Sequence, residues 1–244
     1  MVEKIITAAI LIIGNEILSG RTQDTNVQYL GHGLGEAGIR LGEVRVVPDV
    51  EDVIVEAVNN LRTRFDYLFT TGGIGPTHDD ITAGSIAKAL GVALVRSAEA
   101  EEFLRARYKP EDITEARLKM ADVADGATLI ENPVSAAPGF RIENVFVMAG
   151  VPRIMQAMFD GVIGDLKGGA PVLSRSIEAF VPEGVVAEPL GVLQDKYPDV
   201  DMGSYPFFRD GQLGTCLVAR SPDTDRLDAA AETIADMVRD LKKE

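Results

Sequence analysis

Hydrophobic and polar positions follow two alternating patterns in the first part of the chain. Residues 5–13 are apolar except for Thr7, and this run is rich in isoleucine and shorter than a typical helix, so it predicts a buried strand. Residues 24–37 instead repeat their apolar side chains at helical spacing, and Gly38 follows as a helix stop. The two patterns therefore predict a strand followed by a helix.

The same patterns recur as far as residue 163. They predict strands at residues 40–47, 66–70 and 145–148, further short strands between 125 and 149, and helices at 54–61, 79–90, 99–108, 114–123 and 152–163. A repeated order of strand and helix implies right-handed crossovers and a parallel sheet with helices on both faces. We therefore expect an α/β domain over residues 1–167.

A second domain is predicted after a glycine-rich linker at residues 168–171. Its pattern predicts strands at residues 172–181, 202–208 and 214–220 and helices at 185–197 and 225–241, with a kink at Pro189. This mixture predicts a small α+β domain over residues 171–244. Cys216 lies in an apolar strand, and we expect it to be a small core residue.

Composition and charge narrow the class of ligand. The chain of 244 residues is 46% hydrophobic and 25% charged, as in ordinary globular proteins, and its formal net charge is −14. Because phosphates repel such a charge at long range, we expect no binding to nucleic acid or to an anionic membrane surface. A phosphorylated small molecule would need local positive charge or a cation to bind this chain.

The chain has no pattern typical of secretion or membrane insertion, and we expect a cytoplasmic location. The longest apolar run, residues 5–13, is far shorter than a bilayer span, and the residues before it do not make a signal peptide. The single cysteine, Cys216, excludes an internal disulfide and a thiolate metal cluster, which fits a reducing compartment.

A glycine-rich stretch, TTGGIGPTHDDITAGS at residues 70–85, follows a predicted strand and precedes a predicted helix. Ligands of open α/β sheets bind at the carboxyl edge of the sheet, where such a loop lies. Gly72, Gly73 and Gly75 let backbone amides approach an anion, although no Gly-Lys-Ser/Thr follows, as a Walker A loop would require. A tight turn whose side chains only cap the helix fits the same spacing, so both interpretations stay open.

Two adjacent acids, Asp79 and Asp80, follow these glycines. A cap needs only one polar side chain, such as that of Thr77 or Asp79, so the second carboxylate is either solvated or has another role. A hard divalent cation between the carboxylates and a diphosphate would turn their repulsion into attraction. Alternatively, one carboxylate acts as a general base on water. The acid pair therefore favours a phosphate site that contains a cation.

Two further loops begin where predicted strands end. In GNEILSGRTQDTN, residues 14–26, the side chains of Glu16, Asp24 and Asn26 are expected to reach the same edge of the sheet. A helix entry capped by Asp24 or its neighbour is the simpler alternative. Asp49 follows the second predicted strand, where a helix cap is again the simplest role.

Residues 71–82, TGGIGPTHDDIT, resemble the signature of the molybdopterin-binding fold, in the version carried by CinA-like proteins and by the corresponding domain of eukaryotic FAD synthase. Three further stretches resemble segments of that family in the same order, namely residues 14–26, 132–139 and 150–152. The likeness covers roughly residues 5–165, and residues 203–206 resemble the small domain that follows in CinA and FAD synthase. The chain departs from the family pattern at Asn15, Ser135, Ala136 and Ala149.

The resemblance implies a three-layer α/β domain with a mostly parallel sheet, which binds a pterin or a nucleotide by its phosphates. Carried over by position, the phosphate-binding residues would be Thr71, Gly72, Gly73, Gly75 and Thr77. Asp80 would be the principal catalytic carboxylate and metal ligand, assisted in both roles by Asp79. Asp49 matches a further acidic position of the family and would be a third catalytic carboxylate. Gly14, Glu16 and Asn26 would contact the rest of the ligand, while Asn132 and Gly139 would close the site.

The resemblance leaves three hypotheses open. The first is a pyrophosphatase dependent on Mg²⁺, Mn²⁺ or Co²⁺ that cleaves the diphosphate of a nucleotide such as ADP-ribose or FAD, and the doubled acids favour it. The second is a protein that holds molybdopterin or a nucleotide without chemistry, within molybdenum cofactor biosynthesis. The third is a domain used mainly to assemble a homo-oligomer, the state that we expect here. The chain has no room for the amidase domain of CinA or the adenylyl-transfer domain of FAD synthase, so neither activity is expected.

Overall fold

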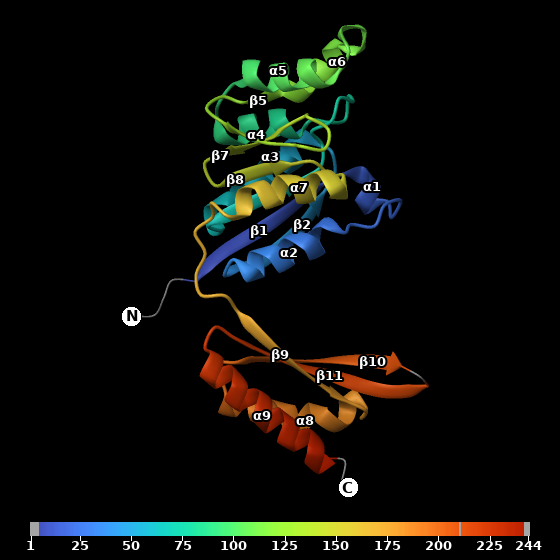
Figure 1. Ribbon diagram of the computed structural model, residues 1–244, viewed down its shortest axis with the longest axis vertical. Coiled ribbons are helices and arrows are strands. Elements are labelled where there is room, and N and C mark those ends of the chain that lie inside the picture. The colour runs from blue at the N-terminus through green and yellow to red at the C-terminus, as the bar shows by residue number, and fades with distance from the viewer. Residues whose placement is uncertain (1–4, 210, 242–244) are drawn as a thin grey trace. The chain divides into compact units, whose positions relative to one another are not determined.

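The structure is a computed structural model that describes residues 5–209 and 211–241. The chain divides into two compact units, Met1–Gly169 and Ala170–Glu244, and the division falls within the glycine-rich segment 168–171 (Figure 1). None of the helices in the described part of the chain is both long enough and apolar enough to span a bilayer.

The first unit is built on a six-stranded sheet with the strand order β2-β1-β3-β8-β7-β6. The strands are β1 Ile6–Ile13, β2 Ile39–Val47, β3 Tyr67–Thr71, β6 Thr128–Ile130, β7 Gly139–Ile142 and β8 Val145–Met148. β2, β1, β3 and β8 run parallel, whereas β7 is antiparallel to both of its neighbours, β8 and β6. The predicted mostly parallel α/β sheet is therefore confirmed.

Helices cover both faces of this sheet. They are α2 Asn26–Glu36 and α7 Pro152–Ile163 on one face and α3 Glu51–Arg64 and α4 Thr82–Leu90 on the other (Figure 1). Alternate residues of β1 pack against the two pairs of helices, and Ala8 to Ile13 are at most 4% exposed. A strand buried on both faces needs a continuous apolar run, which explains the sequence pattern of residues 5–13.

The winding of the sheet reverses at β1. The chain passes from β1 through α2 to β2 on one side, and then through α3 to β3 on the other side of β1. The loops that leave the carboxyl ends of β1 and β3 are therefore neighbours at the switch point, where open α/β sheets bind their ligands. These are the two loops that the sequence singled out.

The region between α4 and β7 differs from its prediction. The single helix expected at 114–123 is a short helix α6 Glu115–Leu118, a 3₁₀ turn at Lys119–Ala121 and a strand β5 Asp122–Ala124. β5 pairs with β4 Leu94–Arg96, a three-residue exposed strand that hydrophobic periodicity does not reveal. The other elements here are α5 Ala98–Arg107 and a 3₁₀ turn at Pro110–Asp112, and α1 Asn15–Leu18 follows β1.

The second unit is an α+β fold, as predicted. Its antiparallel sheet has the order β10-β11-β9, formed by Leu173–Ala179 (β9), Asp201–Arg209 (β10) and Gln212–Ser221 (β11), and its helices are α8 Glu183–Lys196 and α9 Thr224–Leu241. Both helices pack on the sheet face that carries Leu217 and Ala219 (Figure 1). Cys216 alternates with these residues, so it lies on the other face and is half-buried; its predicted place in the core is wrong.

Candidate functional site

The glycine loop after β3 is held by backbone contacts that exclude other residues. Gly72 has a φ of +101°, and a Cβ atom there would lie 2.1 Å from the carbonyl oxygen of Ile13 at the end of β1. Gly73 has a φ of +67°, and its Cβ would lie 2.2 Å from Oγ1 of Thr82. The N–H of Gly72 donates to the carbonyl of Met148 in β8 at 3.1 Å. The loop is thus pressed against the ends of two strands.

Thr82 joins this loop to α4. Its N–H donates to the Gly73 carbonyl at 3.0 Å, and its fully buried hydroxyl donates to the Gly72 carbonyl at 2.9 Å. The helix begins at Thr82 rather than near Asp79, and Ile81 precedes it without any side-chain cap. The sequence-based alternative, in which a loop side chain serves as the cap of this helix, is therefore not what the structure shows.

The two acids form a tight cluster around Thr77 instead. Its hydroxyl lies 2.6 Å from Oδ1 of Asp79 and 2.5 Å from Oδ2 of Asp80, and its N–H donates to the same oxygen of Asp80 at 2.8 Å. A hydroxyl has one proton and can donate to only one carboxylate at a time. The hydrogen bond from Thr77 is the largest cause that lowers the pKa of Asp79, so this group is held ionised. A cation would stabilise such a convergence of oxygens.

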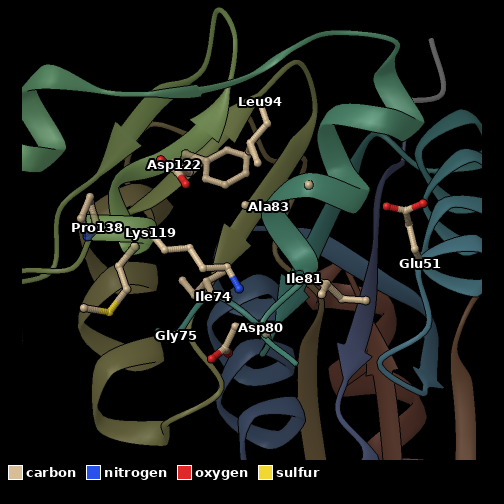
Figure 2. Close-up of a pocket in the computed structure, with 14 residues that line it drawn as sticks. Glu51, Ile74, Gly75, Asp80, Ile81, Ala83, Leu94, Lys119, Asp122 and Pro138 are labelled. Carbon is tan, nitrogen blue, oxygen red and sulfur yellow. The ribbon is translucent and has the colours of Figure 1, made fainter. Parts of the chain in front are cut away.

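A cavity of about 200 Å³ lies beside the glycine loop (Figure 2). Three of the predicted site residues line it, namely Gly73, Gly75 and Asp80. The rest of its lining consists of Glu51, Ile74, Ile81, Ala83, Gly84, Leu94, Lys119, Met120, Asp122, Pro138 and Phe140. The cavity therefore joins the start of α4 to the segment 119–122 and to the beginning of β7.

Lys119 is the residue of this cavity that sequence analysis missed. Its Nζ donates to the carbonyl of Thr77 at 2.8 Å, and Figure 2 shows the side chain extending toward the glycine loop. In the sequence this lysine lies within the helix predicted at residues 114–123, where no motif indicated a site. It reaches the loop because β5 pairs with the unpredicted strand β4 and packs beside α4.

The loop after β1 brings Glu16 and Asp49 to the same edge of the sheet. A Cβ atom on Gly14 would lie 2.5 Å from Oε2 of Glu16, so this carboxylate folds back over the end of β1. Oδ2 of Asp49, which follows β2, accepts the N–H of Asn15 at 2.8 Å. Asp49 thus holds the neighbouring loop in place, rather than capping the helix that follows it in the sequence.

Asn26 and Thr71 carry buried polar atoms that need a further partner. Asn26 is 3% exposed, and its Nδ2 donates to the carbonyl of Gly150 at 2.8 Å. Within the described ranges, Oδ1 of Asn26 and Oγ1 of Thr71 are buried without a hydrogen-bond partner. Leaving such an atom unpaired costs about 1–3 kcal/mol, so a ligand or a water molecule fits both positions. Gly150 also packs against Gly72, which places Asn26 close to the glycine loop.

Asn132 and Gly139 have structural roles that the sequence did not indicate. The amide of Asn132 makes four hydrogen bonds, all within the loop 134–137, which use both amide protons. A Cβ atom on Gly139 would lie 2.3 Å from the carbonyl oxygen of Val147 in β8. Both residues thereby shape the segment that presents Pro138 and Phe140 to the cavity.

The predicted residues therefore form two groups on either side of the glycine loop. Gly73, Gly75, Thr77, Asp79 and Asp80 belong to the cavity side. Gly14, Glu16, Asn26, Asp49, Thr71 and Gly72 lie at the carboxyl ends of β1, β2 and β3. A ligand that contacts both groups would have to extend across the loop.

No group of three or more His, Cys, Asp or Glu side chains in residues 5–209 and 211–241 is arranged to hold a metal ion. Mg²⁺, however, is usually bound by one or two carboxylates together with substrate phosphates and water. The oxygens of Asp79 and Asp80 that converge on Thr77 fit this smaller protein contribution. The donor set is thus suited to a cation that arrives with a phosphorylated ligand.

The fold and the loops at its switch point define an α/β domain of the molybdopterin-binding class. Residues 9–168 match the family described as "Probable molybdopterin binding domain", and the chain belongs to this family. Residues 171–242 match the family described as "FAD synthase, middle domain". The family resemblance inferred from residues 71–82 is confirmed.

Relatives of similar length match most of this chain. A protein of Archaeoglobus fulgidus is 36% identical over 197 residues, which cover 81% of this chain and 84% of the relative. A protein of Pyrococcus furiosus is 32% identical over 231 residues, covering 89% and 92%. Among solved structures, the protein CinA with unknown function from Thermoplasma acidophilum is 35% identical with a TM-score of 0.62, covering 65% of this chain and 96% of that one.

Proposed function

We propose that this protein hydrolyses the diphosphate of a nucleotide such as ADP-ribose or FAD in the presence of a divalent cation. The observation that carries the proposal is the convergence of Asp79 and Asp80 on the hydroxyl of Thr77, directly beside a glycine loop at the switch point of the sheet. Carboxylates at a phosphate site oppose binding unless a cation accompanies the phosphates. Mg²⁺, Mn²⁺ and Co²⁺ are the cations to test.

The chain's own residues have separate roles in this reaction. The glycine loop binds the diphosphate oxygens, and the half-buried carboxylate of Asp80 accepts a proton from the attacking water. The water oxygen forms a new P–O bond as the bridging P–O bond breaks, giving two phosphate monoesters. Thr77 orients Asp80 through two contacts. A divalent cation supplies positive charge against the diphosphate oxygens and makes nearby water more acidic.

The other group of residues fits the remainder of a nucleotide. Oδ1 of Asn26 is a buried acceptor and the hydroxyl of Thr71 a buried donor, both without a partner in the described chain. Hydroxyl groups of a sugar can satisfy both. Glu16 adds a carboxylate over the end of β1. A dinucleotide carries both a diphosphate and sugar hydroxyls, so it offers partners to both groups.

Binding without chemistry is the alternative. The family description, "Probable molybdopterin binding domain", favours it, because it names a bound pterin rather than a reaction. Molybdopterin also carries a phosphate, so it would use the same glycine loop. In this case the protein would act within molybdenum cofactor biosynthesis, and the acids would hold a cation without activating water.

Incubation of the purified protein with ADP-ribose or FAD and each cation tests the proposal, with chromatography to detect AMP. We expect AMP to form only when a divalent cation is present. Asp80→Asn should lower kcat by about 100-fold or more, because a general base contributes roughly that factor, while nucleotide binding persists. Asp165→Asn is the matched control, since Asp165 is an exposed aspartate of the same unit.

Two results would contradict this proposal. If the protein binds molybdopterin tightly and releases no AMP with any cation, the alternative is correct. If Asp80→Asn hydrolyses ADP-ribose at the rate of the unmodified protein, the role given to Asp80 is wrong.

A further inference from the structure

Lys119 and Asp80 face the same cavity without pairing with each other. Glu51 and Asp122 also line this cavity, but each already has a basic partner: Lys88 pairs with Glu51, and Nε of Arg96 lies 2.6 Å from Oδ1 of Asp122. Within the described part of the chain, no carboxylate oxygen lies within 4.0 Å of the Lys119 ammonium nitrogen. No nitrogen of a basic side chain in these residues lies within 4.0 Å of the Asp80 carboxylate either. Lys119 and Asp80 thus line the cavity without a salt bridge, although Lys119 acts at longer range on Asp79, whose pKa it helps to lower.

The ammonium of Lys119 has hydrogen-bonding capacity to spare. It carries three N–H donors, of which one is used on the carbonyl of Thr77 at 2.8 Å. The side chain is half-buried, so its charge is less screened than that of a fully exposed lysine. A cation held at a fixed point beside a loop of glycines is suited to an oxyanion.

The residues around Lys119 restrict which organic group such an oxyanion can carry. Ile74, Ile81, Leu94, Met120 and Phe140 give the cavity an apolar lining next to the charged pair. The volume of about 200 Å³ admits a phosphate group with part of its attached organic group. Because the apolar side chains offer no hydrogen bonds, the polar recognition in this cavity falls to Lys119, Asp80 and the glycine loop.

We propose that Lys119 is a phosphate-binding residue of this site and holds one phosphate of the ligand in the cavity beside Asp80. This deepens the proposed function, on which it rests for the phosphorylated ligand, but it applies equally if the ligand is bound without hydrolysis. Lys119 also offsets the repulsion between this phosphate and the carboxylates of Asp79 and Asp80. Its contact with Thr77 keeps the ammonium next to the acidic turn.

The affinity for inorganic pyrophosphate, measured by titration calorimetry with Mg²⁺ present, tests the role of Lys119 without requiring hydrolysis of a nucleotide. We expect Lys119→Met to weaken binding about 10- to 100-fold, the effect of losing a hydrogen bond to a charged group. Lys119→Arg should restore most of the affinity, and Lys119→Glu should bind more weakly than Lys119→Met. Lys109→Met is the matched control, because it removes the same charge from an exposed position outside the cavity.

These variants separate phosphate binding from a purely structural contact. If Lys119 served only to hold the carbonyl of Thr77, Lys119→Glu and Lys119→Met would be equally weak, and charge would not matter. That result, or equal affinity of Lys119→Met and Lys109→Met, overturns the proposal. So does an unmodified protein that binds neither pyrophosphate nor ADP-ribose.

Kinetics with ADP-ribose distinguish failure of this proposal from failure of the proposed function. Lys119→Met should raise KM about 10-fold or more, with a smaller change in kcat. A protein that binds pyrophosphate through Lys119 but never hydrolyses a nucleotide would refute only the hydrolase. A protein that hydrolyses ADP-ribose with the same KM after Lys119→Met would refute only the role of Lys119.

Discussion

The two sheets of this protein bury their strands differently. In the first unit every residue from Ala8 to Ile13 of β1 is at most 4% exposed, because helices lie on both faces. In the second unit Tyr205 of β10 is 48% exposed, because α8 and α9 share the opposite face of the sheet. The sequence marks the doubly covered strand β1 by a continuous apolar run, whereas β10 mixes polar and apolar residues.

Covering both faces has a consequence for function. Parallel strands need crossovers, and these bring the loops after β1, β2 and β3 to a single edge. In the antiparallel sheet β10 and β11 form a hairpin. Aromatic side chains of β10 cover the open face of this sheet, the one without helices: Tyr205 lies over Gly203, and Phe207 lies over Gly214. The candidate chemistry is therefore concentrated on the first sheet.

The largest expected effect comes from adding one methyl group to the first sheet. Gly72→Ala places Cβ 2.1 Å from a backbone oxygen at a φ of +101°, so we expect a loss of about 3 kcal/mol or more in the free energy of unfolding. Gly203→Ala in the second sheet meets only the ring of Tyr205 at 3.2 Å, and this exposed ring can move. It should change stability by about 1 kcal/mol or less.

Urea unfolding followed by circular dichroism measures both glycine variants. Gly91→Ala is the control for backbone strain alone, since Gly91 has a φ of +71° and open space around it, and it should lose only about 1–2 kcal/mol. If Gly72→Ala is no more damaging than Gly91→Ala, the contact between the glycine loop and the end of β1 is not what excludes a side chain.

An effect of comparable size separates the aromatic rings of the two units. Phe69 is fully buried and stacks on Phe146 with ring centroids 4.9 Å apart, so Phe69→Ala should cost about 3–5 kcal/mol. Phe207 is half-buried on the open face and makes an edge contact with Phe180, so Phe207→Ala should cost about 1 kcal/mol. Hydrogen exchange of amides in β1 and β11 locates each loss. Equal costs would mean that the open face is as closely packed as the core.

The fold was predictable from the sequence where a pattern extends over many residues. The strand at residues 5–13 and the helix before Gly38 are set by burial on one or both faces, and the structure agrees within a few residues. β4 and β5 are only three residues each, and no periodicity can be seen over so short a stretch. The start of α4 was misplaced because Asp79 and Asp80 bind Thr77 rather than the helix.

The candidate site was predictable only in part, for a similar reason. Gly72 and Gly73 can be recognised in the sequence because both have a positive φ, which favours glycine. An added Cβ would also meet the carbonyl of Ile13 at Gly72 and the hydroxyl of Thr82 at Gly73. Lys119 reaches the site through the pairing of β4 with β5, which is a tertiary event. Asn132 looks like a ligand residue in the sequence, yet its hydrogen bonds are all used within its own loop.

The smallest expected effect concerns an exposed ion pair of the second unit. Asp199 accepts two hydrogen bonds from Arg226, from Nε at 2.6 Å and from Nη2 at 2.7 Å, and these lower the pKa of Asp199 from 3.8 to about 2. A pKa that is lower in the folded state stabilises the fold above the unfolded value. This contribution is fully present above about pH 4 and is lost as the pH falls toward 2.

Titration of the Asp199 carboxyl by nuclear magnetic resonance checks this pKa. We expect a midpoint of about 2 in the unmodified protein and a return toward 3.8 in Arg226→Gln. Both side chains are more than 40% exposed, so salt should screen the pair, and the effect on the free energy of unfolding should be slight. If Arg226→Gln left the midpoint unchanged, the ion pair would not persist in solution. The pair would then add nothing to the one-sided core of the second unit.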